Sequence, residues 1–202
     1  MVSPVVVLTL YVALGAFGIG WRSWKHRRST GFSGFHGISG RPGSGEWFIG
    51  AGFVVSIALG VLAPIIQLIG AAAPIPALEA TWLHVAGAAI AIAGLAAMIR
   101  AQAEMGASWR IGVDHEETTA LVRAGIFRTM RNPIYTAMLV FTFGTCLIAP
   151  TPLAFIGFAA LLADLELQVR IIEEPHLRAV HGDTYREYSR AAGRFLPRVG
   201  RI

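Results

Sequence analysis

Long apolar stretches alternate with shorter polar ones along this chain. The apolar runs lie at 3–21, 47–70, 82–99, 134–149 and 152–169. A membrane-crossing helix needs about 17–25 predominantly apolar residues, and the first three runs reach that length. The last two are shorter, and the APTP stretch at 149–152 between them is typical of a tight turn, which indicates a helical hairpin. The pattern predicts an all-α, polytopic integral membrane protein with five transmembrane helices.

The composition agrees with this interpretation. Hydrophobic residues make up 54% of the 202 residues and charged residues only 14%, whereas a soluble domain carries about 25% charged residues. The two shorter runs would also suit buried core helices of a soluble protein, but three long runs in so small a chain favour the membrane. No basic residue precedes the first run, so we expect a retained span and not a cleaved signal peptide.

Basic residues predict the orientation in the membrane. They follow the first run, recur over 100–133 and fill the tail from 170, whereas 71–81 holds none. The positive-inside rule then places these three regions in the cytoplasm and the N-terminus outside, as five spans in the cell (inner) membrane allow. The basic excess therefore reflects topology. We expect no nucleic-acid partner, because basic and aromatic residues are not interleaved as on a nucleic-acid surface.

Charged residues gather at the end of the fifth run. Glu166, Arg170 and Glu173 are spaced to share one helix face, with Glu174 adjacent, and Glu166 before Arg170 is the favourable order for an ion pair. We expect this helix end to be hydrated. Asp164 lies one turn deeper, where an ionisable group indicates function by default. A purely structural ion-pair network is the alternative.

A second candidate region precedes the fourth run. Asn132 suits the N-cap of a helix and Pro133 its first position. Arg131 and Tyr135 flank this start and would also serve as interfacial anchors. A helix-start device alone would explain the pattern without any function.

The two polar regions together resemble a family. The first holds Gln102, Gly106, Ser108, Trp109, Leu121, Val122, Gly125, Arg131, Asn132, Pro133 and Tyr135. The second holds Arg170, Glu173, Glu174, Leu177, Gly182, Tyr185, Tyr188 and the Phe-Leu-Pro sequence at 195–197. In order and spacing, this pattern over about 100–197 is similar to the isoprenylcysteine carboxyl methyltransferases and the related phospholipid methyltransferases.

The resemblance implies an S-adenosylmethionine-dependent methyltransferase acting on a lipophilic small molecule or lipid-tailed acceptor, among membrane lipids, at the cytoplasmic face. It divides the chain into helices one to three with a Gly-rich cytoplasmic loop (1–99) and a catalytic core (100–202). The cytoplasmic connecting segments would form the cofactor pocket. The implied catalytic residues are Arg170, Glu173 and Glu174. The implied cofactor-binding residues are Gln102, Trp109, Leu121, Val122, Gly125, Arg131, Asn132, Pro133, Tyr135 and Glu173.

Three positions depart from the family pattern. Asn132 replaces a His, which removes a possible general base, and His181 replaces a Phe. Pro175 follows the Glu pair, where we expect it to kink the helix.

Two alternative functions stay open. One is an NAD(P)H-dependent membrane sterol or enoyl reductase of the related superfamily. Another is a non-catalytic membrane protein that keeps the fold. A metal site at Glu173, His176 and His181 is disfavoured, because a di-metal bundle needs a second Glu-x-x-His pair and the sequence has none. We therefore expect no metal.

Overall fold

The computed structural model describes residues 2–33, 37–109 and 120–202, and helices account for most of them. The α-helices are α1 (Val2–Ala13), α2 (Arg22–Thr30), α3 (Gly45–Leu68), α4 (Thr81–Met105), α5 (Pro133–Ile148), α6 (Pro152–Leu167) and α7 (Glu174–Ala191). Two π-helical segments, Leu14–Trp21 and Gln168–Glu173, connect α1 to α2 and α6 to α7. Single turns of 3₁₀-helix lie at Pro76–Leu78, Gly106–Ser108 and Gly125–Arg128. The described ranges contain no β-strand, only an isolated bridge between Met130 and Gly193.

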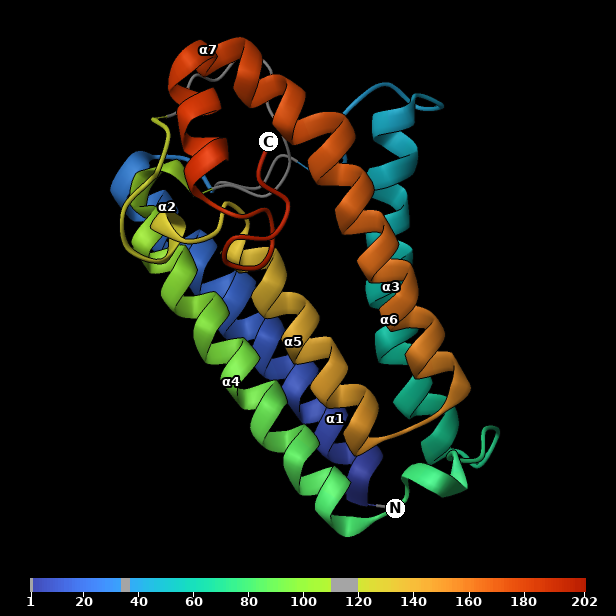
Figure 1. Ribbon diagram of the computed structural model, residues 1–202. Coiled ribbons are helices and arrows are strands. Elements are labelled where there is room, and N and C mark those ends of the chain that lie inside the picture. Colours follow the sequence, from blue (N-terminus) through green and yellow to red (C-terminus); the bar gives the residue numbers. More distant parts are fainter. Residues whose placement is uncertain (1, 34–36, 110–119) are drawn as a thin grey trace.

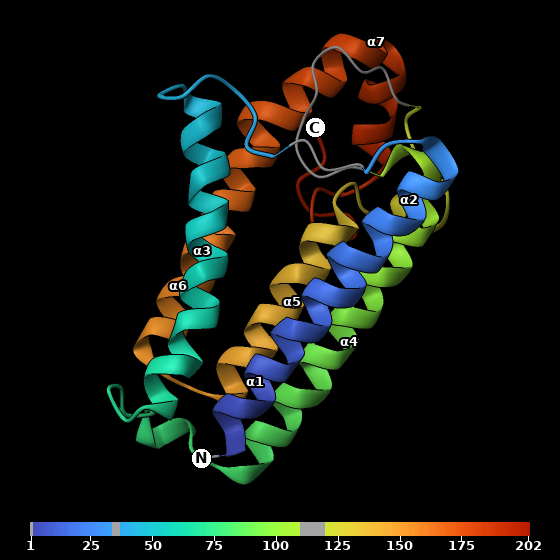
Figure 2. The same cartoon turned by 180° about the vertical axis from the view of Figure 1, so that it is seen from behind.

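The helices form two groups that diverge toward one end of the molecule. Helix α5 packs along α4 with α1 beside them, whereas α6 packs along α3 (Figures 1 and 2). At the diverging end, α7 and the C-terminal tail reach from α6 to the start of α5 (Figure 1). The predicted α5–α6 hairpin is therefore only partly right, because the two helices are joined by a short turn but each packs mainly against another partner.

Small residues explain the choice of α4 as the partner of α5. A Cβ atom built on Gly144 of α5 would lie 2.4 Å from the backbone nitrogen of Ala91 on α4. One built on Gly94 of α4 would lie 2.5 Å from the backbone nitrogen of Phe141. Such backbone-to-backbone contact is typical of membrane helices, which gain no hydrophobic energy by leaving lipid and associate through close packing.

The predicted all-helical, polytopic membrane fold is confirmed. Three helices are long and apolar enough to cross a bilayer: Ser3–Thr30, Gly45–Leu68 and Thr81–Met105. Helix α5 is a shorter apolar helix of 16 residues, about 24 Å long at 1.5 Å per residue. The two termini lie at opposite ends of the bundle, as an odd number of crossings requires (Figure 1).

The first helix does not end where its apolar run ends. It continues through the basic α2 to Thr30 and ends before Gly31. Gly31 has a φ of 87°, in the left-handed region, which glycine adopts at little energetic cost. Apolar positions alone therefore underestimated the length of this helix, because helical structure continues into the polar residues beyond the span.

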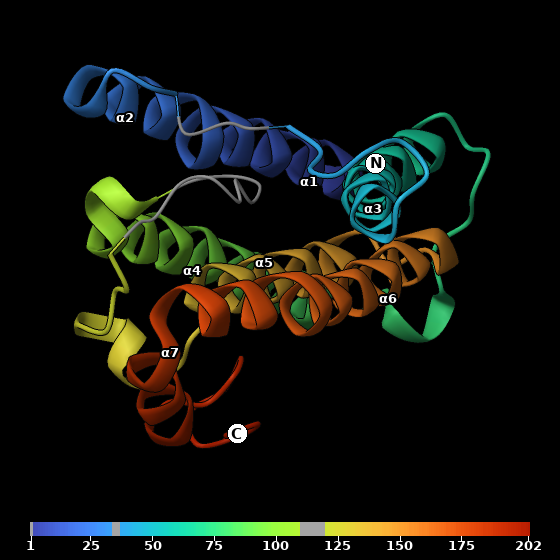
Figure 3. The ribbon, with the colours of Figure 1, turned by 90° about the horizontal axis from the view of Figure 1, so that it is seen from above.

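The last helix bends at a glycine. Pro175 is the second residue of α7, directly after the π-helical segment, in the first turn, where proline is tolerated. The sharp change of direction comes seven residues later at Gly182, with φ 52° and ψ −126°. Helix α7 bends there (Figure 3), and its second half runs toward the start of α5 (Figure 1). The expected kink at Pro175 is thus corrected to a glycine bend at 182.

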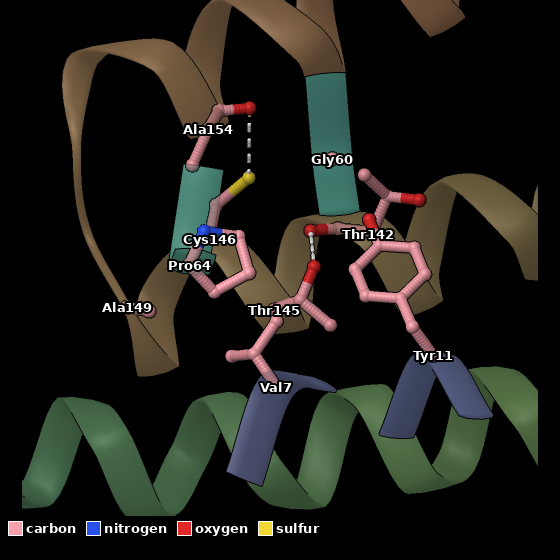
Figure 4. A pocket seen from close by; sticks show the side chains of 9 residues that line it. All are labelled: Val7, Tyr11, Gly60, Pro64, Thr142, Thr145, Cys146, Ala149 and Ala154. Atoms are coloured by element: carbon pink, nitrogen blue, oxygen red, sulfur yellow. Dashed lines mark hydrogen bonds between the residues drawn. The ribbon is translucent and has the colours of Figure 1, made fainter. Parts of the chain in front are cut away.

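A small pocket lies deep in the bundle between α1, α3, α5 and α6 (Figure 4). Its volume of about 10 Å³ holds about one water molecule. Its polar groups bond internally: Thr145 Oγ1 donates to the Thr142 carbonyl at 2.7 Å, and Cys146 Sγ to the Ala154 carbonyl at 3.3 Å. The pocket is too small for an organic ligand, so candidate chemistry must lie elsewhere.

Candidate active site

The two motif regions meet at the start of α5. The backbone N–H of Arg131 donates to the carbonyl of Gly193 at 2.8 Å, and that of Asn132 to the carbonyl of Arg194 at 3.1 Å. The N–H of Gly193 returns a bond to Thr129 at 3.0 Å. This short ladder fixes the C-terminal tail beside the segment that begins α5, so residues far apart in the sequence form one site.

A buried ion cluster lies directly behind this ladder. Arg131 Nη2 donates to Glu174 Oε1 at 2.7 Å, and Arg194 binds both carboxylate oxygens of Glu174, at 2.8 and 3.0 Å. All three side chains belong to buried residues, with exposed fractions of 7%, 5% and 8% for Arg131, Glu174 and Arg194. Arg131 also donates to the carbonyl of Ser189 in α7 and to those of Ala192 and Gly200 in the tail after α7. The cluster thus ties α5, α7 and the tail together.

The ionisation of Glu174 follows from this geometry. Burial opposes its charge, but the hydrogen bonds from Arg194 and Arg131 outweigh burial and hold the pKa of the carboxyl below its usual range. The same hydrogen bond raises the pKa of Arg194. Glu174 is therefore ionised and its charge is already neutralised by protein groups.

Glu173 has different surroundings. The hydroxyl of Tyr135, on the first turn of α5, donates to Glu173 Oε1 at 2.5 Å, and Gln168 Nε2 donates to the same oxygen at 3.3 Å. Glu173 is half-buried. A carboxylate beside an aromatic ring is suited to a cationic ligand, through charge and cation–π contact.

The start of α5 is where the sequence predicts it, but its cap differs. Pro133 is the first helical residue and is buried. The side chain of Asn132 makes no capping bond; its amide donates to the Arg194 carbonyl at 3.1 Å instead. The Asn132 side chain therefore binds the tail. It could not do so if it capped α5.

Arg170 and the Glu pair point in different directions. Arg170 is exposed and pairs with Glu166, the predicted ion pair. Glu173 turns to Tyr135, and Glu174 is buried against the two arginines. The expectation that Glu166, Arg170 and Glu173 share one face is wrong, because the π-helical segment at 168–173 is wider than an α-helix and shifts the phase of its side chains. The expectation of a hydrated helix end holds for Arg170 but not for Glu174.

Two predicted cofactor residues lie against the first helix. The Gln102 amide donates to the Gly18 carbonyl at 2.9 Å. Trp109 is 2% exposed and packs edge-on against His26 at 5.7 Å, with the Arg22 guanidinium 5.0 Å from its ring centre. In this structure both side chains contact residues of the first helix.

The other predicted residues support the tail side. Leu121 packs against Tyr185, Tyr188 and Ala192, and Val122 beside it is half-buried. Burial raises the pKa of Tyr185 to about 12 and raises that of Tyr188 as well, so both phenols stay neutral. Gly125 has φ +58°, and a Cβ there would lie 2.2 Å from the Glu104 carboxylate that accepts the Ile126 N–H. Only glycine fits where the Glu104 carboxylate comes this close to the backbone.

Two arginines of this region are not identified as site residues by the sequence motifs. Arg194 completes the buried cluster and Arg22 covers Trp109, but in the sequence both are ordinary members of basic stretches. Their one signal is position: Arg22 follows the first apolar run directly, and Arg194 directly precedes the Phe-Leu-Pro sequence. Among the described residues, no three His, Cys, Asp or Glu side chains gather as metal ligands would.

The fold and site define a class: a polytopic, all-helical membrane protein whose polar motifs converge at one end of the bundle. The family model described as phospholipid methyltransferase matches residues 82–184. The chain belongs to this family, as the motifs indicated.

Individual relatives agree. Protein-S-isoprenylcysteine O-methyltransferase A of Arabidopsis thaliana is 30% identical over 89 residues, which cover 44% of this chain and 45% of the relative. A probable protein-S-isoprenylcysteine O-methyltransferase of Oryza sativa subsp. indica is 30% identical over 87 residues, 43% and 46% of the two chains. The solved structure of a eukaryotic intramembrane Ras methyltransferase, the isoprenylcysteine carboxyl methyltransferase, has a TM-score of 0.56 at 26% identity and covers 73% of this chain. The match spans less than half of the curated relatives and 53% of that structure.

Proposed function

We propose that this protein is an S-adenosylmethionine-dependent methyltransferase that methylates a lipophilic acceptor at the cytoplasmic face of the membrane. The observation that carries the proposal is the convergence of the two motif regions, through the Arg131–Glu174 ion pair and the Tyr135–Glu173 hydrogen bond. The relatives' names and family favour methyl transfer over the reductase alternative.

The residues at the start of α5 fit the cofactor. S-adenosylmethionine supplies an electrophilic methyl group on a sulfonium cation. The half-buried Glu173 carboxylate would accept hydrogen bonds from its ammonium or ribose hydroxyls. The Tyr135 ring would lie against the cation. Glu174 already binds two guanidinium groups, so we assign it to holding the walls of the site in place and not to contacting the cofactor.

The acceptor side is proposed to lie at the membrane boundary. A lipid-tailed acceptor can keep its apolar part in the bilayer while its nucleophile reaches the start of α5. Arg170 is exposed at this boundary, and among the described residues its guanidinium pairs with the partly exposed Glu166. It is placed to attract an anionic acceptor group. The protein's main contribution would be to position two reactants and to exclude water.

Cofactor binding tests the proposal directly. We expect calorimetry on the detergent-purified protein to detect binding of S-adenosylmethionine and of its demethylated product. Glu173→Gln should weaken that binding about tenfold or more, because a hydrogen bond to a charged group is worth about 1.5–3 kcal/mol. Glu166→Gln, which also removes one carboxylate from this helix, is the matched control and should bind normally.

Two results would contradict the proposal. One is the absence of binding by the folded wild-type protein. The other is binding of NADPH in its place, which would restore the reductase alternative. Equal losses in Glu173→Gln and Glu166→Gln would keep the methyltransferase but remove Glu173 from the cofactor site.

A further inference from the structure

A groove outside the candidate active site opens between α2 and α4. It measures about 300 Å³, the lower end of the range for small-molecule sites. Its lining residues are Trp21, Arg22, Lys25, Ser29, Thr30, Ile99, Ala103 and Gly106. Helix α2 supplies the basic wall, and Ile99 and Ala103 of α4 supply an apolar floor. The lining is thus amphiphilic, cationic on one side and apolar on the other.

Among the described residues, no carboxylate pairs with the cationic wall formed by Arg22 and Lys25. Arg22 is 7% exposed, and its Nη2 donates to the Gly106 carbonyl at 2.5 Å. Its Nε is buried and makes no hydrogen bond. Within the described residues, neither Arg22 nor Lys25 forms a salt bridge. A buried cation without a counter-charge is costly unless an anion pairs with it.

The groove lies at the level of the membrane interface. Trp21 and Trp24 are about half exposed directly after the apolar part of the first helix, as interfacial aromatic residues are. Lys25 lies over the Trp21 ring at 5.3 Å and Arg28 over the Trp24 ring at 4.2 Å. An anion that reaches Lys25 from this level is a lipid headgroup with its chains beside it. The apolar floor formed by Ile99 and Ala103 is placed to receive them.

We infer that the α2–α4 groove binds one anionic phospholipid, with its phosphate on Lys25 and Arg22 and its glycerol and upper acyl carbons on Ile99 and Ala103. Basic pockets between membrane helices bind lipid headgroups through the same chemistry. The site is independent of the proposed cofactor site, because none of its lining residues belongs to the Arg131–Glu174–Arg194 cluster or to the Tyr135–Glu173 pair.

The test uses the delipidated protein, with all 202 residues, in detergent. Native mass spectrometry and thermal stability are measured with dioctanoyl phosphatidylglycerol, with dioctanoyl phosphatidylcholine and with inorganic phosphate. We expect phosphatidylglycerol to bind in preference to the other two and to raise the melting temperature. No S-adenosylmethionine is present, so the outcome does not depend on the proposed enzymatic function.

Three variants on α2 locate the site. Lys25→Gln should bind phosphatidylglycerol about fivefold more weakly, the effect expected for loss of one basic residue near anionic lipid. Arg22→Gln should lose at least as much. Arg28→Gln removes the same charge from the same helix, but Arg28 does not line the groove. Its binding should therefore change less than that of Lys25→Gln. Lys25 is exposed, so its variant should fold even if Arg22→Gln does not.

Other outcomes would overturn the inference. Equal weakening in Lys25→Gln and Arg28→Gln would mean general surface attraction instead of a site. Equal binding of phosphatidylcholine would remove the requirement for an anionic lipid. Lys25-dependent protection by inorganic phosphate alone would assign the groove to a soluble phosphate and not to a lipid.

Discussion

Glu174 neutralises two buried guanidinium groups, and no other carboxylate among the described residues pairs with them. Glu174→Gln would leave Arg131 and Arg194 without a counter-charge in the interior. We expect a loss of about 3–5 kcal/mol in the free energy of unfolding, the usual cost of breaking a buried pair from one side. Denaturant unfolding in detergent measures it.

The exposed Glu166–Arg170 pair provides the control. Glu166→Gln should cost less than about 1 kcal/mol, because surface pairs are hydrated and screened. If both substitutions cost the same small amount, the cluster at Glu174 contributes little to folding and its carboxylate is available for another role.

The ionisation of Glu174 also predicts how stability depends on pH. Its native pKa lies below the ordinary value of 4.5, so the contribution is complete above that pH. As the pH falls through about 4.5 toward the native pKa, the unfolded chain binds a proton that the native chain does not, and stability is lost. Melting temperatures between pH 7 and 3 should fall more steeply for the wild-type protein than for Glu174→Gln. Parallel curves would show that Glu174 is not the group responsible.

In contrast to Glu174, Arg170 should matter for turnover and not for stability. It is exposed and pairs with the partly exposed Glu166, so Arg170→Ala should change stability by less than about 1 kcal/mol. If it orients an anionic acceptor as proposed, turnover should fall about 100-fold, as for other positioned charges in active sites. Affinity for S-adenosylmethionine should stay unchanged. A variant that unfolds yet keeps normal turnover in its folded fraction would make Arg170 structural.

At the scale of the elements, the bend of α7 depends on one glycine. Gly182 adopts φ 52° and ψ −126°, a region essentially limited to glycine, and a Cβ there would meet nothing within 4 Å. Any cost of Gly182→Ala is therefore backbone strain, about 1–3 kcal/mol. Gly45→Ala is the control, because Gly45 also has open space around it but no positive φ; it should be neutral or slightly stabilising. Unfolding measurements that rank the two equally would contradict the glycine bend.

The elements also separate what the sequence can predict from what it cannot. Apolar run length predicts the helices, and the Asn-Pro pair at 132–133 predicts the start of α5, because both are local properties. The π-helical segment before α7 and the bend at Gly182 are not local. They depend on where α7 must go to bring Glu174 to Arg131, and no spacing rule carries that information.

The same division applies to the site. The sequence motifs identify Arg131, Tyr135, Glu173 and Glu174 but not how they pair. Arg194 is found only when the tail folds back along the start of α5. Gln102 and Trp109 resemble family cofactor residues, yet they contact the first helix here. The division of the chain into 1–99 and 100–202 stays a prediction.

For the whole molecule, the charges and the architecture point the same way. Helix α2, the start of α5 and α7 with the tail all lie at one end of the bundle (Figures 1 and 2). The described connection between α3 and α4 lies at the other end and holds no basic residue. Both the candidate active site and the α2–α4 groove therefore belong to the basic end, which the positive-inside rule assigns to the cytoplasm.

This orientation can be tested with single cysteines in intact cells. Ala77, between α3 and α4, is predicted to be outside and Ser44, just before α3, to be cytoplasmic. The native Cys146 is 1% exposed and should not react with a polar reagent. A membrane-impermeant maleimide added to cells should label Ala77→Cys and not Ser44→Cys, and permeabilised cells should label both. Labelling of Ser44→Cys alone in intact cells would invert the topology. The basic end would then face away from the compartment where S-adenosylmethionine is made, and the proposed function would lose its access to cofactor.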